Sequence, residues 1–115
     1  MALDVLQSTE IIQAMETFLD KRRPPEHMRH ELDLGYRIDG QSVHIFTISP
    51  HWQKKEMIME SPIAKTTWVH SQKVWKIYWM RADLKWHSYE PTREVKTIEK
   101  FLEVVDKDQH CCFWG

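Results

Sequence analysis

The segment LDLGYRIDGQSVHIFTI, residues 32–48, decides the fold, because it places an Asp-Gly pair between two runs that alternate apolar and polar residues. An Asp-Gly pair in this setting predicts a two-residue β-hairpin loop, since a type I′ turn requires positive φ at both central positions. With Asp39 and Gly40 as the loop, we expect two antiparallel strands. The predicted pairs are Ile38 with Gln41, Tyr36 with Val43, and Leu34 with Ile45.

This register gives the hairpin an apolar and a polar side, because successive side chains of a strand point to opposite faces. The apolar side is predicted to hold Leu32, Leu34, Tyr36, Ile38, Val43 and Ile45, and the other side Asp33, Arg37, His44 and Phe46. A shift of one residue would expose the whole apolar set, so the hydrophobic pattern strongly specifies which side is buried.

Further strands are expected after residue 63, with turns centred on Ser71-Gln72 and on Ala82-Asp83. These turns predict that Trp68 pairs with Trp75, Ala64 with Trp79, and Trp79 with Trp86. One face would then hold Trp68, Trp75, Ile77, Trp79 and Trp86, and the other Lys65, Thr67, Lys76, Tyr78, Met80, Lys85, His87 and Tyr89. Residues 49–62 show no clean period and are expected to form a loop or an irregular edge.

Helical periodicity flanks the strands. An N-terminal helix over about residues 4–22 is predicted from an apolar stripe that consists of Ile11, Ile12, Met15, Phe18 and Leu19. A C-terminal helix, capped by Thr92 or Thr97, is predicted from Val95, Ile98, Phe101, Leu102 and Val105. Phe113 and Trp114 are expected to tuck the chain end against the body. We therefore expect one α+β domain over residues 1–115, with an N-terminal helix, an antiparallel meander of about five strands, and a C-terminal helix.

The composition narrows the functional classes. Sixteen basic and 17 acidic residues nearly cancel, so an attraction to nucleic acid would have to come from a local patch. No apolar run approaches the roughly 18 residues of a membrane span, and the first residues lack a signal-peptide pattern. Two adjacent cysteines do not make a disulfide framework. A cytoplasmic location without membrane contact is the expectation.

The tryptophans are predicted to form the core rather than a binding platform. A buried aromatic ring removes about 150–250 Å² from water, which corresponds to about 4–6 kcal/mol as an upper bound. A nucleobase stacked on an exposed ring returns only about 1–3 kcal/mol. Four exposed tryptophans would therefore lose more than a ligand restores, and we expect both helices to cover their face.

The opposite face is the candidate binding surface, because it interleaves cations with tyrosine and histidine rings. The candidate binding residues are Lys65, Lys76, Tyr78, Arg81, Asp83, Lys85, His87 and Tyr89. Lys65, Lys76 and Lys85 are expected to form a row across three strands. The hypothesis is a non-enzymatic binding module for nucleic acid or a protein partner. A solvated face with lysine stems over rings, or a homodimer that pairs these faces, are the alternatives.

An enzyme is the alternative of a different class. Arg81, Asp83, Lys85 and His87 would form a polar cluster that acts on a phosphate-bearing substrate. Asp83-Leu84-Lys85, together with a carboxylate such as Asp33, is also similar to the metal site of nucleases, although an aspartate in a turn usually bonds its own backbone.

We expect no cofactor and no metal. The donor groups in His27, His30, Glu31, His110, Cys111 and Cys112 do not have the spacing of a tetrahedral zinc site. The Cys111–Cys112 pair is interpreted as two structural thiols.

Several segments together resemble a known family. They are KRRPP at 21–25, LDLGYRIDGQSV at 32–43, PIAK at 62–65, VWKIYWMRADLKWHSYEP at 74–91 and FWG at the end. The chain is similar over nearly its whole length to a family of small bacterial proteins that is known only as a domain of unknown function, family three-zero-two-four. The resemblance implies a bacterial, cytoplasmic setting and brings no activity with it. Members usually have a varied residue at position 111, so the cysteine pair is expected to be particular to this chain.

Overall fold

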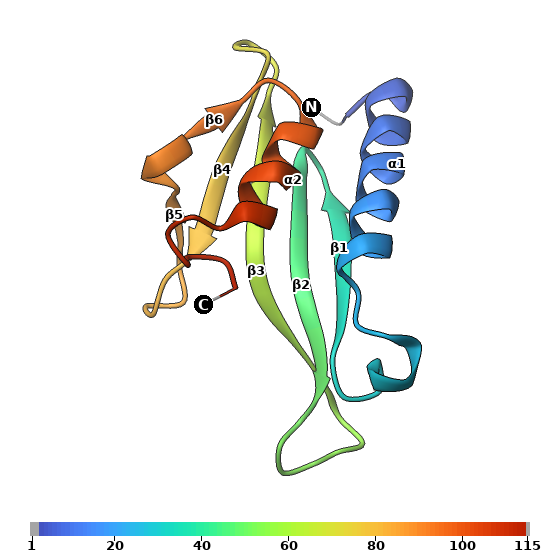
Figure 1. Ribbon diagram of the computed structural model, residues 1–115. Coiled ribbons are helices and arrows are strands. Elements are labelled where there is room, and N and C mark those ends of the chain that lie inside the picture. The colour runs from blue at the N-terminus through green and yellow to red at the C-terminus, as the bar shows by residue number, and fades with distance from the viewer. Residues whose placement is uncertain (1–2, 115) are drawn as a thin grey trace.

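A computed structural model describes residues 3–114 as a six-stranded antiparallel sheet with two helices on one face (Figure 1). The first two residues of the N-terminal stretch and Gly115 of the C-terminal FWG motif lie outside the described residues. The strands are β1 (Asp33–Asp39), β2 (Ser42–Pro50), β3 (Ile58–Val69), β4 (Val74–Met80), β5 (Trp86–Ser88) and β6 (Glu94–Val95). The first five follow one another across the sheet, and β6 pairs with β4 beside β5. The predicted α+β architecture is confirmed.

The first hairpin has the predicted faces but a different loop. Gly40 and Gln41 form the loop, so Tyr36 pairs with Ile45 and Ile38 with Val43. Gly40 has φ of 60°, whereas Gln41 is not among the residues with positive φ, which is the pattern of a type II′ turn with glycine first. The pairing differs from the predicted one by two residues, and a shift of two keeps every side chain on its face. Leu32 precedes β1 and is exposed, so its predicted place on the apolar side is wrong.

The expected irregular segment at residues 49–62 is strand at both ends and loop only over residues 51–57. β2 continues to Pro50 and β3 begins at Ile58, and the paired ends project beyond the sheet as an arm (Figure 1). We call residues 49–59 the arm. The pairing of β2 with β3 shifts where Ile45 faces Ala64 and Phe46 faces Pro62, so Ile63 is an extra residue. This bulge interrupts the alternation and explains why the sequence shows no clean period there.

The third turn decides where Trp86 lies. The predicted pairs of β3 with β4, Trp68 with Trp75 and Ala64 with Trp79, are confirmed. The loop to β5 has five residues, 81–85, rather than two, and Met80 therefore pairs with Trp86, and Trp79 with His87. This shift of one residue moves Trp86 to the face of Lys65 and Tyr78. It moves His87 away from that face.

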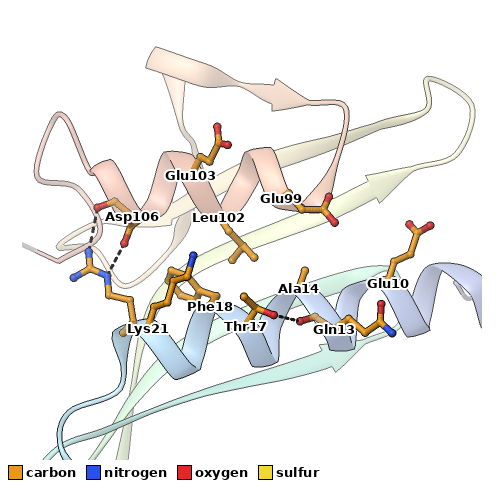
Figure 2. A pocket seen from close by; sticks show the side chains of 11 residues that line it. Glu10, Gln13, Ala14, Thr17, Phe18, Lys21, Glu99, Leu102, Glu103 and Asp106 are labelled. Atoms are coloured by element: carbon orange, nitrogen blue, oxygen red, sulfur yellow. Dashed lines mark hydrogen bonds and ion pairs between the residues drawn. The ribbon is translucent and has the colours of Figure 1, made fainter.

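Both helices pack on the tryptophan face, as expected. α1 (Val5–Arg22) begins with a capping box between Asp4 and Gln7, and α2 (Ile98–Lys107) is capped by Thr97. The core consists of Ile11, Met15, Phe18, Leu19, Leu34, Val43, Ile45, Ala64, Trp75, Ile77, Tyr89, Ile98, Phe101, Leu102, Val105 and Phe113. Ile12 is exposed and Val95 belongs to β6, in contrast to the prediction. The two helices leave a groove between them (Figure 2). No described helix is long and apolar enough to cross a membrane.

Asp108 anchors the C-terminal tail. The residue follows α2 in the left-handed conformation, with φ of 41°. Its carboxylate accepts hydrogen bonds from the backbone N–H groups of Cys112, Phe113 and Trp114 at 2.8, 3.1 and 2.9 Å. The Trp114 indole N–H donates to the Val105 carbonyl at 2.8 Å. These bonds confirm the expected tucked terminus.

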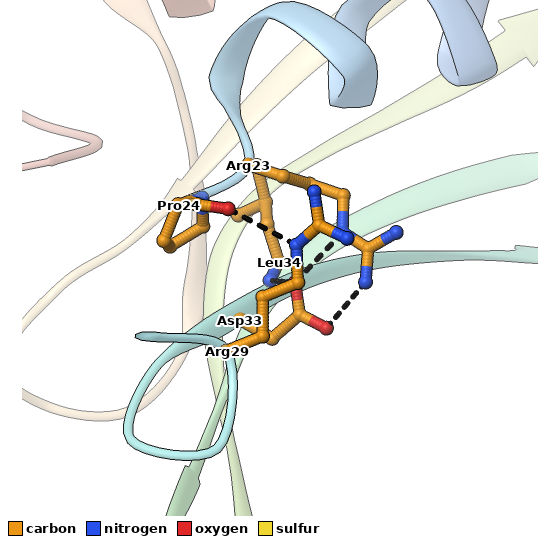
Figure 3. A network of polar contacts seen from close by, with 5 residues as sticks. All are labelled: Arg23, Pro24, Arg29, Asp33 and Leu34. Carbon is orange, nitrogen blue, oxygen red and sulfur yellow. Dashed lines mark hydrogen bonds and ion pairs between the residues drawn. The ribbon is translucent and has the colours of Figure 1, made fainter. Parts of the chain in front are cut away.

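Arg23 and Asp33 tie the end of α1 to the start of β1 (Figure 3). The guanidinium donates to both carboxylate oxygens, at 2.8 and 2.6 Å, and the Leu34 N–H donates to one of them at 2.8 Å. The pKa of Asp33 is lowered, first by the hydrogen bonds from Arg23 and then, against the opposing effect of burial, by the bond from Leu34. The carboxylate is therefore held in its charged form in the folded protein.

Asp33→Asn is expected to lower the free energy of unfolding by about 1 kcal/mol at neutral pH, because solvent reaches part of the pair. A lowered folded-state pKa gives stability that is present above the unfolded pKa of about 3.9 and lost as pH falls through the folded value. Urea unfolding at several pH values checks this: the difference between wild type and variant should shrink below about pH 4. A difference that stays constant down to pH 2.5 would contradict the assigned role.

Candidate binding face

The sheet face opposite the helices is the candidate site, and we call it the open face. Cross-strand pairing arranges its side chains in rows. One row consists of Asp39, Ser42, Thr67, Lys76 and Glu94, and the next of Arg37, His44, Lys65, Tyr78 and Ser88. A third group consists of Gly35, Phe46, Pro62, Met80 and Trp86. Within residues 3–114 both helices lie on the other face, so these rows have no helix over them.

A cation surrounded by rings lies at the centre of the open face. The Lys65 ammonium is 4.9 Å from the centre of the Tyr78 ring and 5.3 Å from that of Trp86. The His44 ring meets Trp86 edge-on at 5.9 Å. Burial lowers the pKa of Lys65, and burial followed by the charge of Lys65 lowers the pKa of His44. At neutral pH the centre therefore presents one partly desolvated cation beside a neutral imidazole.

Beside this centre is a hollow of about 160 Å³ between β1, β2, β3 and β5. It is lined by Arg37, His44, Ile45, Phe46, Glu60, Pro62 and Trp86. The Arg37 guanidinium lies 4.8 Å from the centre of the Phe46 ring and donates to Glu60 at 2.8 Å. Gly35 makes room for this arrangement, because a Cβ atom there would lie 2.9 Å from Cε2 of Phe46. The hollow thus lies between the rings of Phe46 and Trp86 and beside the ion pair of Arg37 with Glu60.

The charges of the open face are mixed rather than basic. Carboxylates lie at both ends of one row, Asp39 on β1 and Glu94 on β6, and Glu60 neutralises Arg37. The expected row of three lysines is not formed, because Lys65 and Lys76 belong to neighbouring rows and Lys85 lies in the loop at 81–85. The longer loop removes Lys85 from the row, whereas Lys65 and Lys76 lie in neighbouring rows already in the predicted register of β3 and β4.

The remaining predicted site residues lie around that loop or in the core. Tyr89 is 2% exposed and packs against Phe113 at 4.8 Å between ring centres, so it is not part of the open face. Its N–H donates to the Ile77 carbonyl at 2.9 Å, which fixes it beside β4. Burial raises the pKa of its hydroxyl. The side chain serves the core.

Asp83 organises the loop between β4 and β5. Its carboxylate accepts from the Lys85 N–H at 3.0 Å and contacts Nε2 of His87 at 2.9 Å. The hydrogen bond with His87, followed by that with Lys85, lowers the pKa of Asp83. Arg81 lies over the Trp79 ring at 5.5 Å, and Lys85 is exposed. The structure thus brings Asp83 and His87 together as a turn-forming pair, which agrees with the interpretation that a turn aspartate bonds its own backbone.

The alternatives based on metal are not supported by the geometry of the described residues. Asp33 lies on the edge strand β1 and is engaged by Arg23, whereas Asp83 precedes β5 at the opposite edge. His30 and Glu31 approach to 3.7 Å, with both side chains largely exposed. Over residues 3–114, no three histidine, cysteine or acidic groups converge as metal ligands would.

An antiparallel sheet with two helices on one face and an aromatic, uncovered second face defines an open-faced two-layer α+β protein. The chain belongs to the family described as a domain of unknown function, DUF3024, whose sequence model matches residues 3–115. This confirms the family resemblance found in the sequence. No curated protein and no solved structure matches the chain.

Sequence reasoning missed several residues of this site. Trp86 was placed in the core, and the hollow beside it was not foreseen. The signal for half of the site was nevertheless present, since the alternation of the first hairpin placed Arg37, His44 and Phe46 on the side away from the apolar set.

Proposed function

We propose that this protein is a non-enzymatic binding module whose open face engages a partner protein. The observation that supports the proposal best is the cluster of Lys65, Tyr78 and Trp86 beside a hollow, on a face without a helix. Aromatic rings, methionine and arginine are enriched at the centres of protein interfaces, and charged groups are found at their rims. The open face follows this distribution in the rings of Tyr78 and Trp86 and in the edge carboxylates Asp39 and Glu94, and departs from it in Lys65, which lies between the two rings.

A protein partner fits the face better than nucleic acid does. A strand of nucleic acid requires a track of cations along its phosphates. On the open face Arg37 is paired with Glu60, and Lys65 is partly buried over two rings. Lys76 lies directly opposite Glu94. Phosphates would therefore meet repulsion at the edges, whereas a protein can offer charges of both signs.

The partner is expected to insert an apolar side chain into the hollow. Interface residues that fill a pocket and exclude water dominate binding, and truncation of such a residue often costs about 2 kcal/mol or more. Trp86 forms one wall of the hollow and supports Lys65. It is therefore the residue whose removal should weaken binding most.

The experiment is site-specific photo-crosslinking in the cells that make the protein. A photoreactive residue replaces Thr67 on the open face or Thr9 on the exposed side of α1. We expect a covalent adduct with one protein from position 67 and none from position 9. With that partner purified, Trp86→Ala should weaken binding at least about 30-fold, in line with about 2 kcal/mol.

Leu84→Ala is the matched control, because Leu84 is 80% exposed in the adjacent loop but lies off the open face. It should leave the affinity unchanged. Equal adducts from both positions, or equal losses for the two variants, would contradict the proposal. Binding of a labelled single strand at low salt, lost on Lys65→Ala with Lys76→Ala, would replace the protein partner with nucleic acid.

A further inference from the structure

The arm exposes several large apolar side chains. Trp52 is 77% exposed, Ile58 72%, and Met57 51%. Lys54 and Lys55 lie between them in the chain and are also exposed. Contiguous exposed apolar side chains with a polar rim mark interaction sites.

The tip of the arm is an ordered loop. Nδ1 of His51 accepts hydrogen bonds from the backbone N–H groups of Gln53 and Lys54, each at 3.1 Å. The His51 ring stacks on Trp52, with centres 6.0 Å apart and planes 19° from parallel. The Met57 N–H donates to the Lys54 carbonyl at 2.9 Å and closes the loop. These bonds fix the backbone on both sides of the arm tip before any partner arrives, which reduces the entropy that binding has to overcome.

The groove between α1 and α2 has the complementary chemistry (Figure 2). Its volume is about 760 Å³, and its apolar lining consists of the half-buried Ala14 above Phe18 and Leu102, which are each 7% exposed. Four carboxylates, Glu10, Glu99, Glu103 and Asp106, line it together with the cations Lys21 and Arg22. Asp106 is paired with Arg22, and Glu103 contacts Lys100. Glu10 and Glu99 make no ion pair with any described residue.

We propose that the arm of one copy of this chain docks into the α1–α2 groove of a second copy. Trp52 and Ile58 would cover the apolar surface of the groove, and Lys54 and Lys55 would meet Glu10 and Glu99. The arm projects away from both helices of its own chain, so the contact is made between two copies (Figure 1). A two-fold pair, in which each copy supplies one arm and one groove, makes both contacts and closes.

An anionic lipid surface is the competing occupant, because tryptophan and lysine also favour membrane interfaces. Glu56 lies in the arm and would be repelled by such a surface. The groove, in contrast, offers the unpaired carboxylates that two lysines need. A second copy therefore accounts for both surfaces with one contact.

Sedimentation of the purified full chain tests the proposal. As the protein concentration is raised from about 5 to 200 µM, a range that detects micromolar dissociation constants, the average molecular mass should rise from 13.9 kDa toward twice that value. Trp52→Ser with Ile58→Ser, in the arm, and Glu10→Lys with Glu99→Lys, in the groove, should each weaken association at least about tenfold. Glu31→Lys, a charge change at a residue outside the groove lining, should have no effect.

A charge exchange makes the test specific. The groove change should be rescued when Lys54→Glu and Lys55→Glu are added to the same chain, because the contact then pairs opposite charges again. A chain that stays at 13.9 kDa throughout, association that ignores the groove change, or failure of the rescue would overturn the proposal. So would binding of phosphatidylglycerol vesicles that Trp52→Ser abolishes in a protein that remains monomeric.

Sedimentation of a Trp86 variant separates this proposal from the proposed function of the open face. Trp86→Ala on the open face should leave self-association unchanged, since neither the arm nor the groove contains it. Self-association that is lost on Trp86→Ala would show instead that two open faces pair, and would overturn the arm-and-groove contact.

Discussion

Replacing Trp75 with alanine is expected to lower the free energy of unfolding by about 3–5 kcal/mol, the usual range for an emptied large aromatic site. Trp75 is 4% exposed, packs against Trp68 at 5.3 Å between ring centres, and lies under the helices. Trp86→Ala is the matched control, because it removes the same side chain from the opposite face. Trp86 is half-buried with neither helix over it, so the loss should be about 1.5–2.5 kcal/mol, roughly half the value for full burial.

Urea unfolding of the two variants measures both losses, with the dependence on urea concentration checked for two-state behaviour. The comparison separates the observed register from the predicted one. If β5 had paired so that Trp79 lay opposite Trp86, the Trp86 side chain would point to the same face as Trp75, and both would be buried in the core. Equal losses would therefore contradict the register of β5.

The second large effect is expected at the chain end. Asp108→Ala should lower the free energy of unfolding by about 2–3 kcal/mol, because three backbone N–H groups lose a charged acceptor at once. Alanine also tolerates the left-handed conformation of this position less well than aspartate. Phe113, which is buried against Tyr89, would then lose the bonds that hold its segment in place.

Two variants and one local measurement make this prediction specific. Asp106→Ala removes a carboxylate that is exposed and ion-paired with Arg22, and it should cost less than about 1 kcal/mol. Asp108→Asn should fall between them, since asparagine keeps one acceptor oxygen and tolerates the left-handed region. Hydrogen exchange should accelerate at residues 112–114 in Asp108→Ala and stay slow in Asp106→Ala. Unchanged exchange in Asp108→Ala would show that packing alone holds the tail.

The two proposals assign partner binding and self-association to different surfaces of the molecule. The open face, with Trp86 at its centre, would bind another protein. The arm and the α1–α2 groove would join two copies of this chain and place two open faces in one assembly, and paired sites can raise the apparent affinity for a repetitive or dimeric partner. The variants at Trp86, Trp52 and Glu99 test these roles independently, because the residues lie on separate parts of the structure.

Local patterns were sufficient for the elements whose partners lie nearby in the chain. The apolar stripe that includes Ile11, Met15, Phe18 and Leu19 predicted α1 to within a residue. The faces of the first hairpin were predicted although its loop was not, because alternation depends on parity and a shift of two residues preserves it. The turn centred on Ser71 and Gln72 was predicted together with its register, and the pairing of Trp68 with Trp75 confirms it.

The arm was not predictable in the same way. A bulge at Ile63 changes the parity of β3 partway along, and no local preference specifies where an extra residue enters a ladder. Exposure of both faces also removes the apolar alternation on which strand prediction depends. The hollow beside Phe46 was not predictable either, because its lining comes from strands that are distant in the sequence, among them β2, β3 and β5.

The register of β5 was decided only by the tertiary structure, and with it the composition of the open face. The sequence by itself predicts that Trp86 and Tyr89 must lie on opposite faces, because their positions along an extended strand differ by three, an odd number. Both are aromatic, and either can be the buried one. Phe113 favours Tyr89 as the buried ring, because α2 and the hydrogen bond to Asp108 hold the two ring centres 4.8 Å apart. Tyr89 then fills the core and Trp86 is left on the open face, since burial of an apolar group depends on surfaces that meet in three dimensions and not on neighbours in the chain.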